Sequence, residues 1–269
     1  TGEHQSPLAA IASHQIAHLP PKSTLLEAAR LMVRQRISSL LILDDARRVL
    51  GILSEDGLLA ALHNATPPQT PLAEVMAPPV TVPATISCAE AYQRCLHEGV
   101  PHLVLVDDRQ RAVAVVSDTD YRRCLDLQAP AAQTRIGAIM SRAAAIFPPD
   151  TPLGTALAQM HTRVCGVVIV VDRQQKPVGI LSQRDMARLY LDEVESDERC
   201  LAEVMTSPVR TLPMDATLAQ AAEAMLTQQV RQYPVVDASG RLMGIIAARD
   251  LTQAMAFGMV DASPTRDQT

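Results

Sequence analysis

One stretch of this sequence occurs four times at nearly constant spacing. GILSEDGLLAA begins at Gly51, AVVSDTDYRRC at Ala114, GILSQRDMARL at Gly179 and GIIAARDLTQA at Gly244. Successive occurrences begin 63, 65 and 65 residues apart, and prolines at positions 20, 83, 148 and 213 keep the same steps. Self-similarity at a fixed period is typical of repeat architectures. The chain therefore consists of four repeats of about 64 residues each.

Composition narrows the class of protein before any motif is considered. The 269 residues are 48% hydrophobic and only 2% aromatic, so the cores must be aliphatic. The net charge is −5 and no basic run appears, which argues against nucleic acid and anionic membranes as partners. The longest apolar runs, such as residues 167–171, are far too short to span a bilayer. With no signal peptide at its start, the chain is expected to be cytoplasmic.

Cysteine and histidine spacing predicts neither a disulfide framework nor a metal site. The five cysteines form no C-x-x-C pair and their number is odd, which is typical of reduced thiols. His14 and His18 are four residues apart, but no third ligand accompanies them. We therefore expect no metal and no obligate cofactor.

Each repeat has a local pattern that predicts an α/β unit in the order strand, helix, strand, strand, helix. A short extended piece ending in proline precedes a helix start with the spacing of a capping box. These boxes are Thr24 with Glu27, Ser87 with Glu90, and Thr217 with Gln220. The first of two apolar strands is expected at residues 40–43, 103–106, 167–171 and 233–236. A unit this small buries little surface alone, so we expect the repeats to pair.

These residues resemble the cystathionine β-synthase (CBS) domain family. The matching pieces are Val-Met at 75–76 and 204–205, the stretch from Tyr233 to Asp237, and Gly-hydrophobic-x-Ser-x-x-Asp at 179–185. The resemblance implies an α/β fold of four tandem CBS repeats that pair into two Bateman modules, similar to the gamma subunit of the AMP-activated kinase. The expected repeats span residues 8–66, 67–128, 129–194 and 195–258, and the expected modules span residues 8–128 and 129–258.

The resemblance also implies a function. Modules of this family bind adenine nucleotides, such as AMP, ADP and ATP, and regulate an effector domain in the same or another chain, with a homodimer as one assembly. We expect a regulatory ligand-sensing module and no enzyme, because the repeats leave no segment for a catalytic motif. The alternative is a dimerisation or scaffold module whose nucleotide sites are vestigial.

Ser182 and Asp185, three residues apart at a strand end, allow two interpretations. A helix cap alone would explain them, since Ser can accept a helix amide while Asp reaches back. The family instead uses such a pair for nucleotides, with the carboxylate on the ribose and the helix start near a phosphate. Ser117 and Asp120 repeat the pair in repeat two.

Repeats one and four depart from this pattern. In repeat one, Gly57 holds the carboxylate position, and Asp56 lies one residue early and is expected to point elsewhere. In repeat four, Ala247 lacks the hydroxyl while Asp250 remains. We therefore expect good sites in repeats two and three, a doubtful one in repeat four and none in repeat one.

Further contacts follow from the resemblance alone. Backbone near the first strand would hold the base, and the residues just before the next strand would touch it. Arg231 would face the phosphates of the repeat-three site, and Arg184 and Arg249 precede the aspartate of their motifs. A solvated helix face is the competing interpretation of these arginines. The base contacts are expected at Val80, Ala145, Pro101, His102, Gly166 and Val167.

Overall fold

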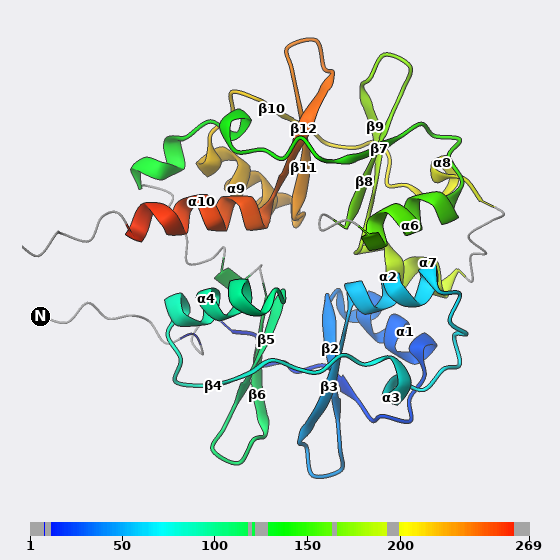
Figure 1. Cartoon of the computed structure of the whole chain (residues 1–269), viewed down its shortest axis with the longest axis vertical. Coiled ribbons are helices and arrows are strands. Elements are labelled where there is room, and N and C mark those ends of the chain that lie inside the picture. The colour runs from blue at the N-terminus through cyan, green and yellow to red at the C-terminus, as the bar shows by residue number, and fades with distance from the viewer. Residues whose placement is uncertain are drawn as a thin grey trace, which may run out of the picture.

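The structure is a computed structural model that describes residues 8, 12–117, 120–121, 129–162, 166–192 and 199–260. It contains four three-stranded sheets, one in each repeat, so the predicted mixed α/β architecture is confirmed. In every sheet the short first strand pairs parallel with the second, and the second pairs antiparallel with the third. Figure 1 shows two sheets side by side in each half of the molecule.

The elements recur in the same order along the chain. Repeat one contains β1 (His18–Leu19), α1 (Leu25–Gln35), β2 (Ser39–Leu43), β3 (Val49–Ser54) and α2 (Glu55–His63). Repeat two contains α3 (Leu72–Val75), β4 (Thr81–Pro83), α4 (Cys88–Glu98), β5 (His102–Val106) and β6 (Ala112–Ser117). Repeat three contains the 3₁₀ helices η2 (Pro130–Gln133) and η3 (Ile136–Ala138), then β7 (Ala145–Phe147), α6 (Leu153–Thr162), β8 (Val167–Val171), β9 (Pro177–Ser182) and α7 (Asp185–Leu191). Repeat four contains α8 (Leu201–Val204), β10 (Leu212–Pro213), α9 (Leu218–Gln228), β11 (Gln232–Val236), β12 (Leu242–Ala247) and α10 (Ala248–Val260).

Local sequence signals account for the first long helix of three repeats. The Thr24 hydroxyl accepts the Glu27 amide at 3.2 Å, while the Glu27 carboxylate accepts the Thr24 amide at 2.8 Å. The same reciprocal pair begins α4 at Ser87 and α9 at Thr217. The three predicted capping boxes are therefore confirmed. Each satisfies two amides that the helix itself cannot bond.

The repeats pair through their sheets. Leu41 and Leu43 of β2 pack against Val104 and Val106 of β5. In the same way, Val167, Ile169 and Val171 of β8 pack against Ile245 of β12. This burial covers the apolar sheet face that one repeat would leave exposed. The chain therefore forms two Bateman modules, module one from repeats one and two and module two from repeats three and four.

In each repeat, the segment before the first strand packs into the core of the partner repeat. Leu72, which precedes the first strand of repeat two, is fully buried in the core of repeat one. Leu8, which precedes the first strand of repeat one, is buried in the core of repeat two. In module two, Ile136 of repeat three packs in the core of repeat four, and Leu201 of repeat four packs in that of repeat three. We call this reciprocal packing the segment exchange.

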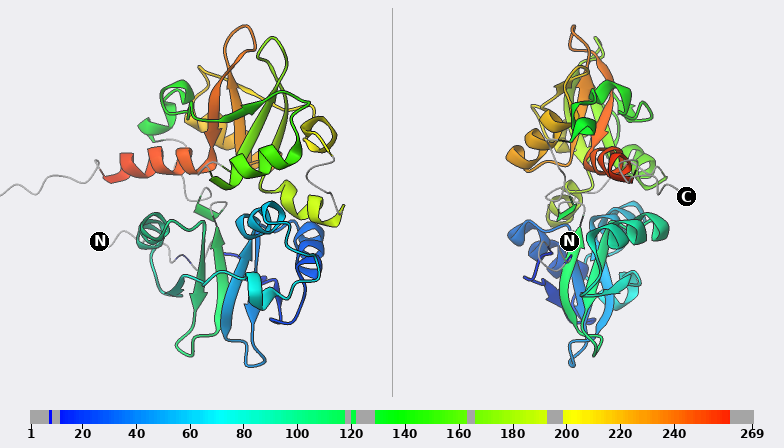
Figure 2. Two further views of the ribbon diagram at one scale, coloured as in Figure 1. Left: turned by 45° about the vertical axis from the view of Figure 1, so that its right-hand side comes forward. Right: turned by 90° about the vertical axis from the view of Figure 1, so that its left-hand side faces the viewer.

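The two modules meet through helices of repeats one and three. Helices α1 and α2 pack against α6 and α7, and one hydrophobic cluster runs continuously across the junction. Figures 1 and 2 show the modules stacked with their β-hairpins pointing to opposite ends of the molecule. The third-strand ends and second-helix starts of repeats one, three and four therefore lie near the centre.

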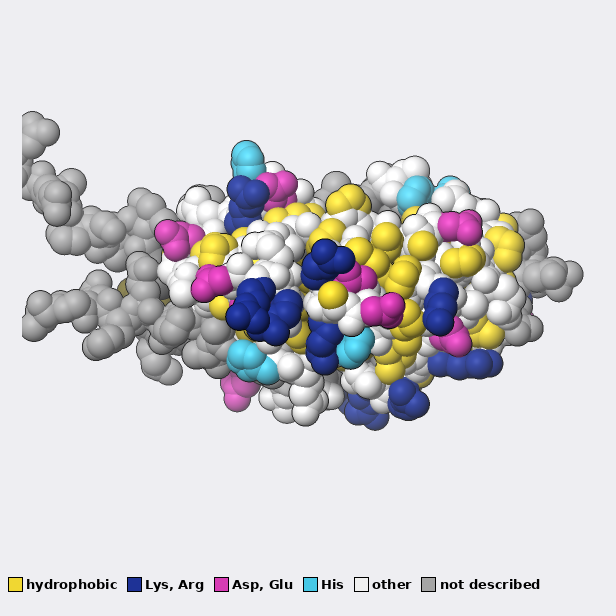
Figure 3. Space-filling model, turned by 90° about the horizontal axis from the view of Figure 1, so that it is seen from below, with side chains coloured by type: hydrophobic (Ala, Val, Ile, Leu, Met, Phe, Trp, Pro, Cys, Tyr) yellow, Lys and Arg dark blue, Asp and Glu magenta, His cyan; other side chains and the backbone are white. Residues whose placement is uncertain are grey.

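The hairpin ends of module one carry charges of both signs. Asp44 accepts the backbone amide and the guanidinium of Arg48, each at 2.8 Å, and Asp107 holds Arg111 in the same way. Figure 3 views this end and shows basic, acidic and hydrophobic side chains interspersed. Within the described ranges, no helix is both long enough and apolar enough to cross a bilayer.

Candidate functional site

The described residues enclose a cavity of about 770 Å³ at the junction of the two modules. All four repeats contribute to its lining, because the modules stack with their sheet ends inward. A volume of this size is typical of small-molecule sites. Eight of the residues predicted from the sequence line it: Pro101, His102, Val167, Ser182, Arg184, Asp185, Arg231 and Asp250.

Repeat three places Ser182 and Asp185 on one wall of the cavity. The Ser182 amide donates to Asp185 Oδ2 at 2.8 Å, and the Ser182 hydroxyl donates to the same oxygen at 3.0 Å. Helix α7 begins only at Asp185, and its first turn has no side-chain cap. In the helix-cap interpretation Asp185 reaches back to the Ser182 amide, as the structure shows, but the Ser182 hydroxyl donates to Asp185 and does not accept a helix amide. Asp185 instead gathers donors from the turn that precedes it.

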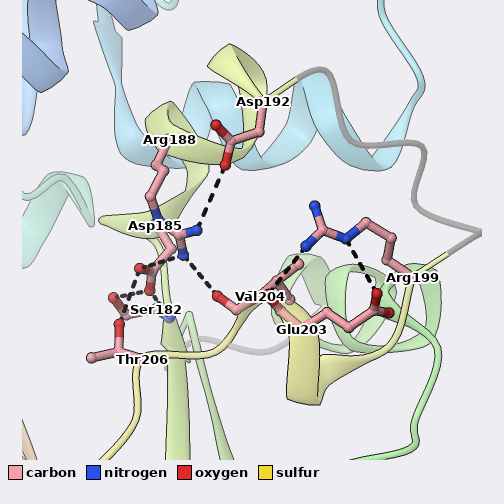
Figure 4. Close-up of polar contacts among 8 residues, drawn as sticks. All are labelled: Ser182, Asp185, Arg188, Asp192, Arg199, Glu203, Val204 and Thr206. Atoms are coloured by element: carbon pink, nitrogen blue, oxygen red, sulfur yellow. Dashed lines mark hydrogen bonds and ion pairs between the residues drawn. The ribbon is translucent and has the colours of Figure 1, made fainter.

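The second oxygen of Asp185 faces groups from outside the motif. Arg188 Nη2 lies 3.3 Å from Asp185 Oδ1, and the Thr206 hydroxyl lies 3.4 Å from it. Arg188 also donates to the Val204 carbonyl at 2.7 Å, so it joins α7 to the segment that leads into repeat four. Figure 4 shows these contacts converging on Asp185. The two contacts to Oδ1 are long, so this oxygen can take stronger donors from a ligand.

The same aspartate contact recurs in repeats two and four. The Ser117 amide and hydroxyl donate to Asp120 Oδ2 at 2.8 and 3.0 Å. The Ala247 amide donates to Asp250 Oδ2 at 2.7 Å, but Ala247 has no hydroxyl to add. Burial raises the pKa of Asp250, and the Ala247 amide and Arg249 oppose that rise. The backbone contact therefore belongs to the fold, and the hydroxyl is the variable part.

Repeat one, for which the sequence predicts no site of its own, contributes two carboxylates to the described lining of the cavity. Glu55 forms an ion pair with Arg231 of repeat four, and Asp56 accepts a hydrogen bond from the Gln183 side chain of repeat three. Burial raises the pKa of both carboxyl groups, and Arg231 opposes the rise in each case. Asp56 therefore lines the shared cavity next to Glu55.

The three arginines of the cavity differ in their partners. The Arg231 side chain is only 22% exposed and is paired with Glu55, so it is not on a solvated helix face. Arg184 donates to the Gln229 carbonyl at 2.5 Å. Burial first, and then the charge of Arg231, lowers the pKa of Arg184. Arg249 lines the same cavity from the start of α10.

His102 is buried at the start of β5, where its Nε2 atom lies 3.0 Å from the Ser38 hydroxyl. Burial, and secondarily the charge of Arg231, lowers the pKa of His102 to about 4. The imidazole is therefore neutral near pH 7. It adds polarity to the cavity without adding charge.

The other predicted residues do not appear in the described lining of this cavity. Ser117 and Asp120 form their own contact in repeat two. The Val80 carbonyl accepts the Val104 amide at 2.9 Å, and the Gly166 carbonyl accepts the Gln183 amide at 3.1 Å. Ala145 is buried and pairs with Val168 in the sheet. Among the described residues, no group of three or more potential ligands could hold a metal ion.

Sequence reasoning missed Glu55 and Gln183. Glu55 follows Ser54 directly, where nothing in the repeat pattern sets it apart. Its partner Arg231 lies 176 residues away, in the other module. Only the docking of the modules brings the two together. A sign that could have directed attention to Glu55 is its place at the first position of a helix, beside the motif serine.

Comparison with known proteins establishes the family. The profile of the CBS domain matches residues 8–64, 72–126, 136–192 and 201–257, so this chain belongs to the CBS domain family. The crystal structure of MJ1225 from Methanocaldococcus jannaschii, a proposed archaeal homologue of g-AMPK, has the same fold. That similarity has a TM-score of 0.82 at 20% identity, and it covers 92% of this chain and 99% of that one. A conserved protein from Pyrococcus horikoshii is similar with a TM-score of 0.62 at 19% identity, over 92% and 98% of the two chains.

Curated relatives are similar over shorter stretches. Protein MK0525 of Methanopyrus kandleri is 28% identical over 111 residues, which are 41% of this chain and 56% of that protein. Inosine-5'-monophosphate dehydrogenase of Methanocaldococcus jannaschii is 34% identical over 109 residues, which are 40% of this chain and 21% of the enzyme. The chain thus spans about half of MK0525 and about a fifth of the dehydrogenase, and this similarity carries no dehydrogenase activity to it.

Proposed function

We propose that this chain is a regulatory module that binds an adenine nucleotide of the AMP, ADP and ATP class in the cavity between its modules. One observation carries the proposal. The aspartate of the repeat-three motif and the guanidinium groups of Arg184 and Arg231 line one cavity of ligand size. Carboxylates suit the paired hydroxyls of a ribose, and guanidinium groups suit a phosphate.

Each part of the cavity has a role in this proposal. Asp185 Oδ1 accepts the ribose hydroxyls, because its present donors are more than 3.2 Å away. Ser182 keeps Asp185 oriented through its amide and hydroxyl. Arg184 and Arg231 take the phosphate. The base lies on the apolar side formed by Val167, Ile180 and Ile245. Pro101 and His102 line the same cavity from module one and remain the proposed base contacts of the repeat-two site.

The remaining predicted residues belong to the same proposal. Val80 would hold the base in a second site built on Ser117 and Asp120, and Ala145 and Gly166 would support the base of the first site. Asp250 serves a weaker site in repeat four, because it lacks the neighbouring hydroxyl. The ranges 8–66, 67–128, 129–194 and 195–258 are our proposed repeat boundaries.

Regulation follows from the position of the cavity. A ligand that contacts both modules favours the module arrangement that fits it best, and it shifts the equilibrium by its difference in affinity for the two arrangements. We propose that an effector domain, in the same chain or another, responds to that shift. The chain itself carries out no reaction in this scheme and needs no cofactor. A cytoplasmic location remains part of the proposal.

The second candidate function is a dimerisation or scaffold module with vestigial sites. One observation favours it. Glu55 neutralises Arg231, and Ser182, Arg188 and Thr206 already surround Asp185, so the cavity groups satisfy one another within the protein. A scaffold would need no ligand to hold this arrangement.

Titration calorimetry of the full chain with AMP and with ATP separates the two candidates. Saturable binding with a fixed stoichiometry supports the sensor. Solution scattering at saturation should then differ from scattering of the free protein. Absence of binding heat for both nucleotides, together with no change in thermal unfolding, would leave the scaffold as the better account.

A further inference from the structure

Glu55 comes from the repeat for which we expected no site. It starts helix α2 in module one and reaches across the junction to the Arg231 guanidinium of module two. The two side chains are only 9% and 22% exposed, so water screens the pair weakly. Arg231 is also the group best placed to take a ligand phosphate, since it comes from the partner repeat and lines the same cavity as Asp185.

The charges of the lining do not favour a strongly anionic ligand. Within the described part of the chain, the lining carries four carboxylates and three guanidinium groups. His102 adds no charge near pH 7, because its pKa lies at about 4. A phosphate that takes the Nη2 donor of Arg231 displaces the Glu55 carboxylate from it, and that carboxylate stays in the same cavity. The carboxylates are Glu55, Asp56, Asp185 and Asp250, and the guanidinium groups are Arg184, Arg231 and Arg249.

We infer that Glu55 determines the charge specificity of the cavity by competing with phosphate for Arg231, so that the preferred ligand is an adenosine compound with at most one phosphate. Arg184 remains for a single phosphate, since among the described residues its guanidinium donates only to the Gln229 carbonyl. Each added phosphate brings more negative charge toward Glu55 and Asp56 in a poorly screened space. The inference rests on the proposed function and names the ligand class within it.

The first test needs no variant of Glu55. Calorimetry compares adenosine, AMP, ADP and ATP, which differ only in the number of phosphates, without divalent cations that would mask phosphate charge. The chain carries Asp120→Asn, so that the proposed repeat-two site does not add to the signal. We expect ATP to bind about tenfold more weakly than AMP. Equal or tighter binding of ATP would overturn the inference.

The second test removes the competing charge. Glu55→Gln keeps the shape of the side chain and should strengthen ATP binding about tenfold while adenosine changes less than about twofold. Glu223→Gln makes the same chemical change on the exposed face of α9 and should alter neither affinity. The gain for ATP should vanish when Arg231→Gln is added, because the two side chains act as a pair.

The outcomes separate this inference from the proposed function. If AMP binds but Glu55→Gln and Glu223→Gln give the same ATP affinity, the role of Glu55 is wrong while the nucleotide site stands. If none of the four adenosine compounds binds the parent chain, the proposed function fails and the inference falls with it. Thermal unfolding of each variant shows whether a lost signal reflects loss of the fold.

Discussion

Among the described residues, module one contributes two carboxylates and an imidazole to the shared cavity, whereas module two contributes three guanidinium groups and two aspartates. The scaffolds are alike, and the difference begins where the second helix of a repeat starts. Helix α2 starts at Glu55, directly after Ser54, while α7 starts at Asp185, three residues after Ser182. A small shift in the helix start thus changes which side chain meets the cavity, although the sheet that positions it is the same.

His102 contributes no charge to the cavity near pH 7, and a lower pH should change this by protonating its imidazole. Its pKa is about 4 in the fold against an ordinary value of 6.5, so the folded chain binds fewer protons between these pH values. The stability that neutral His102 contributes is therefore complete above pH 6.5 and is lost as pH falls toward 4. The loss is about 3 kcal/mol in free energy of unfolding.

Urea unfolding at pH 4, 5, 6 and 7 measures this effect. His102→Gln should remove most of the acid loss, since glutamine does not titrate and can still bond the Ser38 hydroxyl. His97→Gln, on the exposed surface of α4, is the matched control and should follow the parent. Parallel pH profiles for all three proteins would show that His102 is not held neutral.

The aspartates of module two belong to an intact motif, Ser182 with Asp185, and to an incomplete one, Ala247 with Asp250. Asp185→Asn removes the charge that favours two hydroxyl donors, so affinity for AMP should fall about ten- to hundredfold. The fold should change little, because a lost helix-start contact costs about 1 kcal/mol. Asp120→Asn should act likewise at the site of repeat two. Asp250→Asn should change AMP affinity much less, and calorimetry of the three variants ranks them.

The hydroxyl that distinguishes repeats three and four is the next smaller effect. Ser182→Ala makes repeat three resemble repeat four, and it should weaken AMP binding about fivefold through the loss of about 1 kcal/mol. Ala247→Ser makes the reverse change and should strengthen a repeat-four site by a similar factor. Calorimetric stoichiometry shows whether a second ligand is gained. If Ser182→Ala binds AMP as the parent does, the hydroxyl has no part in orienting Asp185.

Asp250 offers the smallest effect. Burial raises its pKa in the fold, so the folded chain holds its proton to higher pH than the unfolded chain does. The contribution of Asp250 to the free energy of unfolding therefore falls as pH rises from its unfolded pKa of 3.8 through its folded pKa. Asp250→Asn should remove this dependence of the free energy of unfolding on pH. The change should be smaller than the one that His102→Gln produces at acid pH. An unchanged slope in urea unfolding between pH 4 and 7 would contradict the prediction.

Much of the fold was readable from the sequence because its signals are local and repeated. The capping boxes at Thr24, Ser87 and Thr217 lie within three residues of their partners, and the apolar strands repeat at a fixed step. The site was only partly readable. The order Ser182 to Asp185 predicted a contact between them, but the direction of the hydroxyl bond depends on where α7 begins.

The contacts of Glu55 and Asp56 escaped prediction because they depend on how the modules dock. Glu55 contacts Arg231 and Asp56 contacts Gln183 only because the two modules pack against each other. Periodicity describes each repeat by itself and is silent about which repeat faces which. The same limit explains why repeat one, poor in motif, still contributes two carboxylates to the cavity.

The segment exchange bears on how such a chain can grow or shrink. Leu72 packs in the core of repeat one and Leu8 in that of repeat two, so each repeat supplies a side chain that completes the core of its neighbour. A gene that lost repeat two alone would leave a cavity in the core of repeat one in place of Leu72, and it would leave Leu8 with no core to pack in. A pair of repeats, by contrast, contains both of these segments and both of the cores in which they pack. The heritable building block is therefore the pair, and duplication, deletion or grafting of these sequences should succeed two repeats at a time.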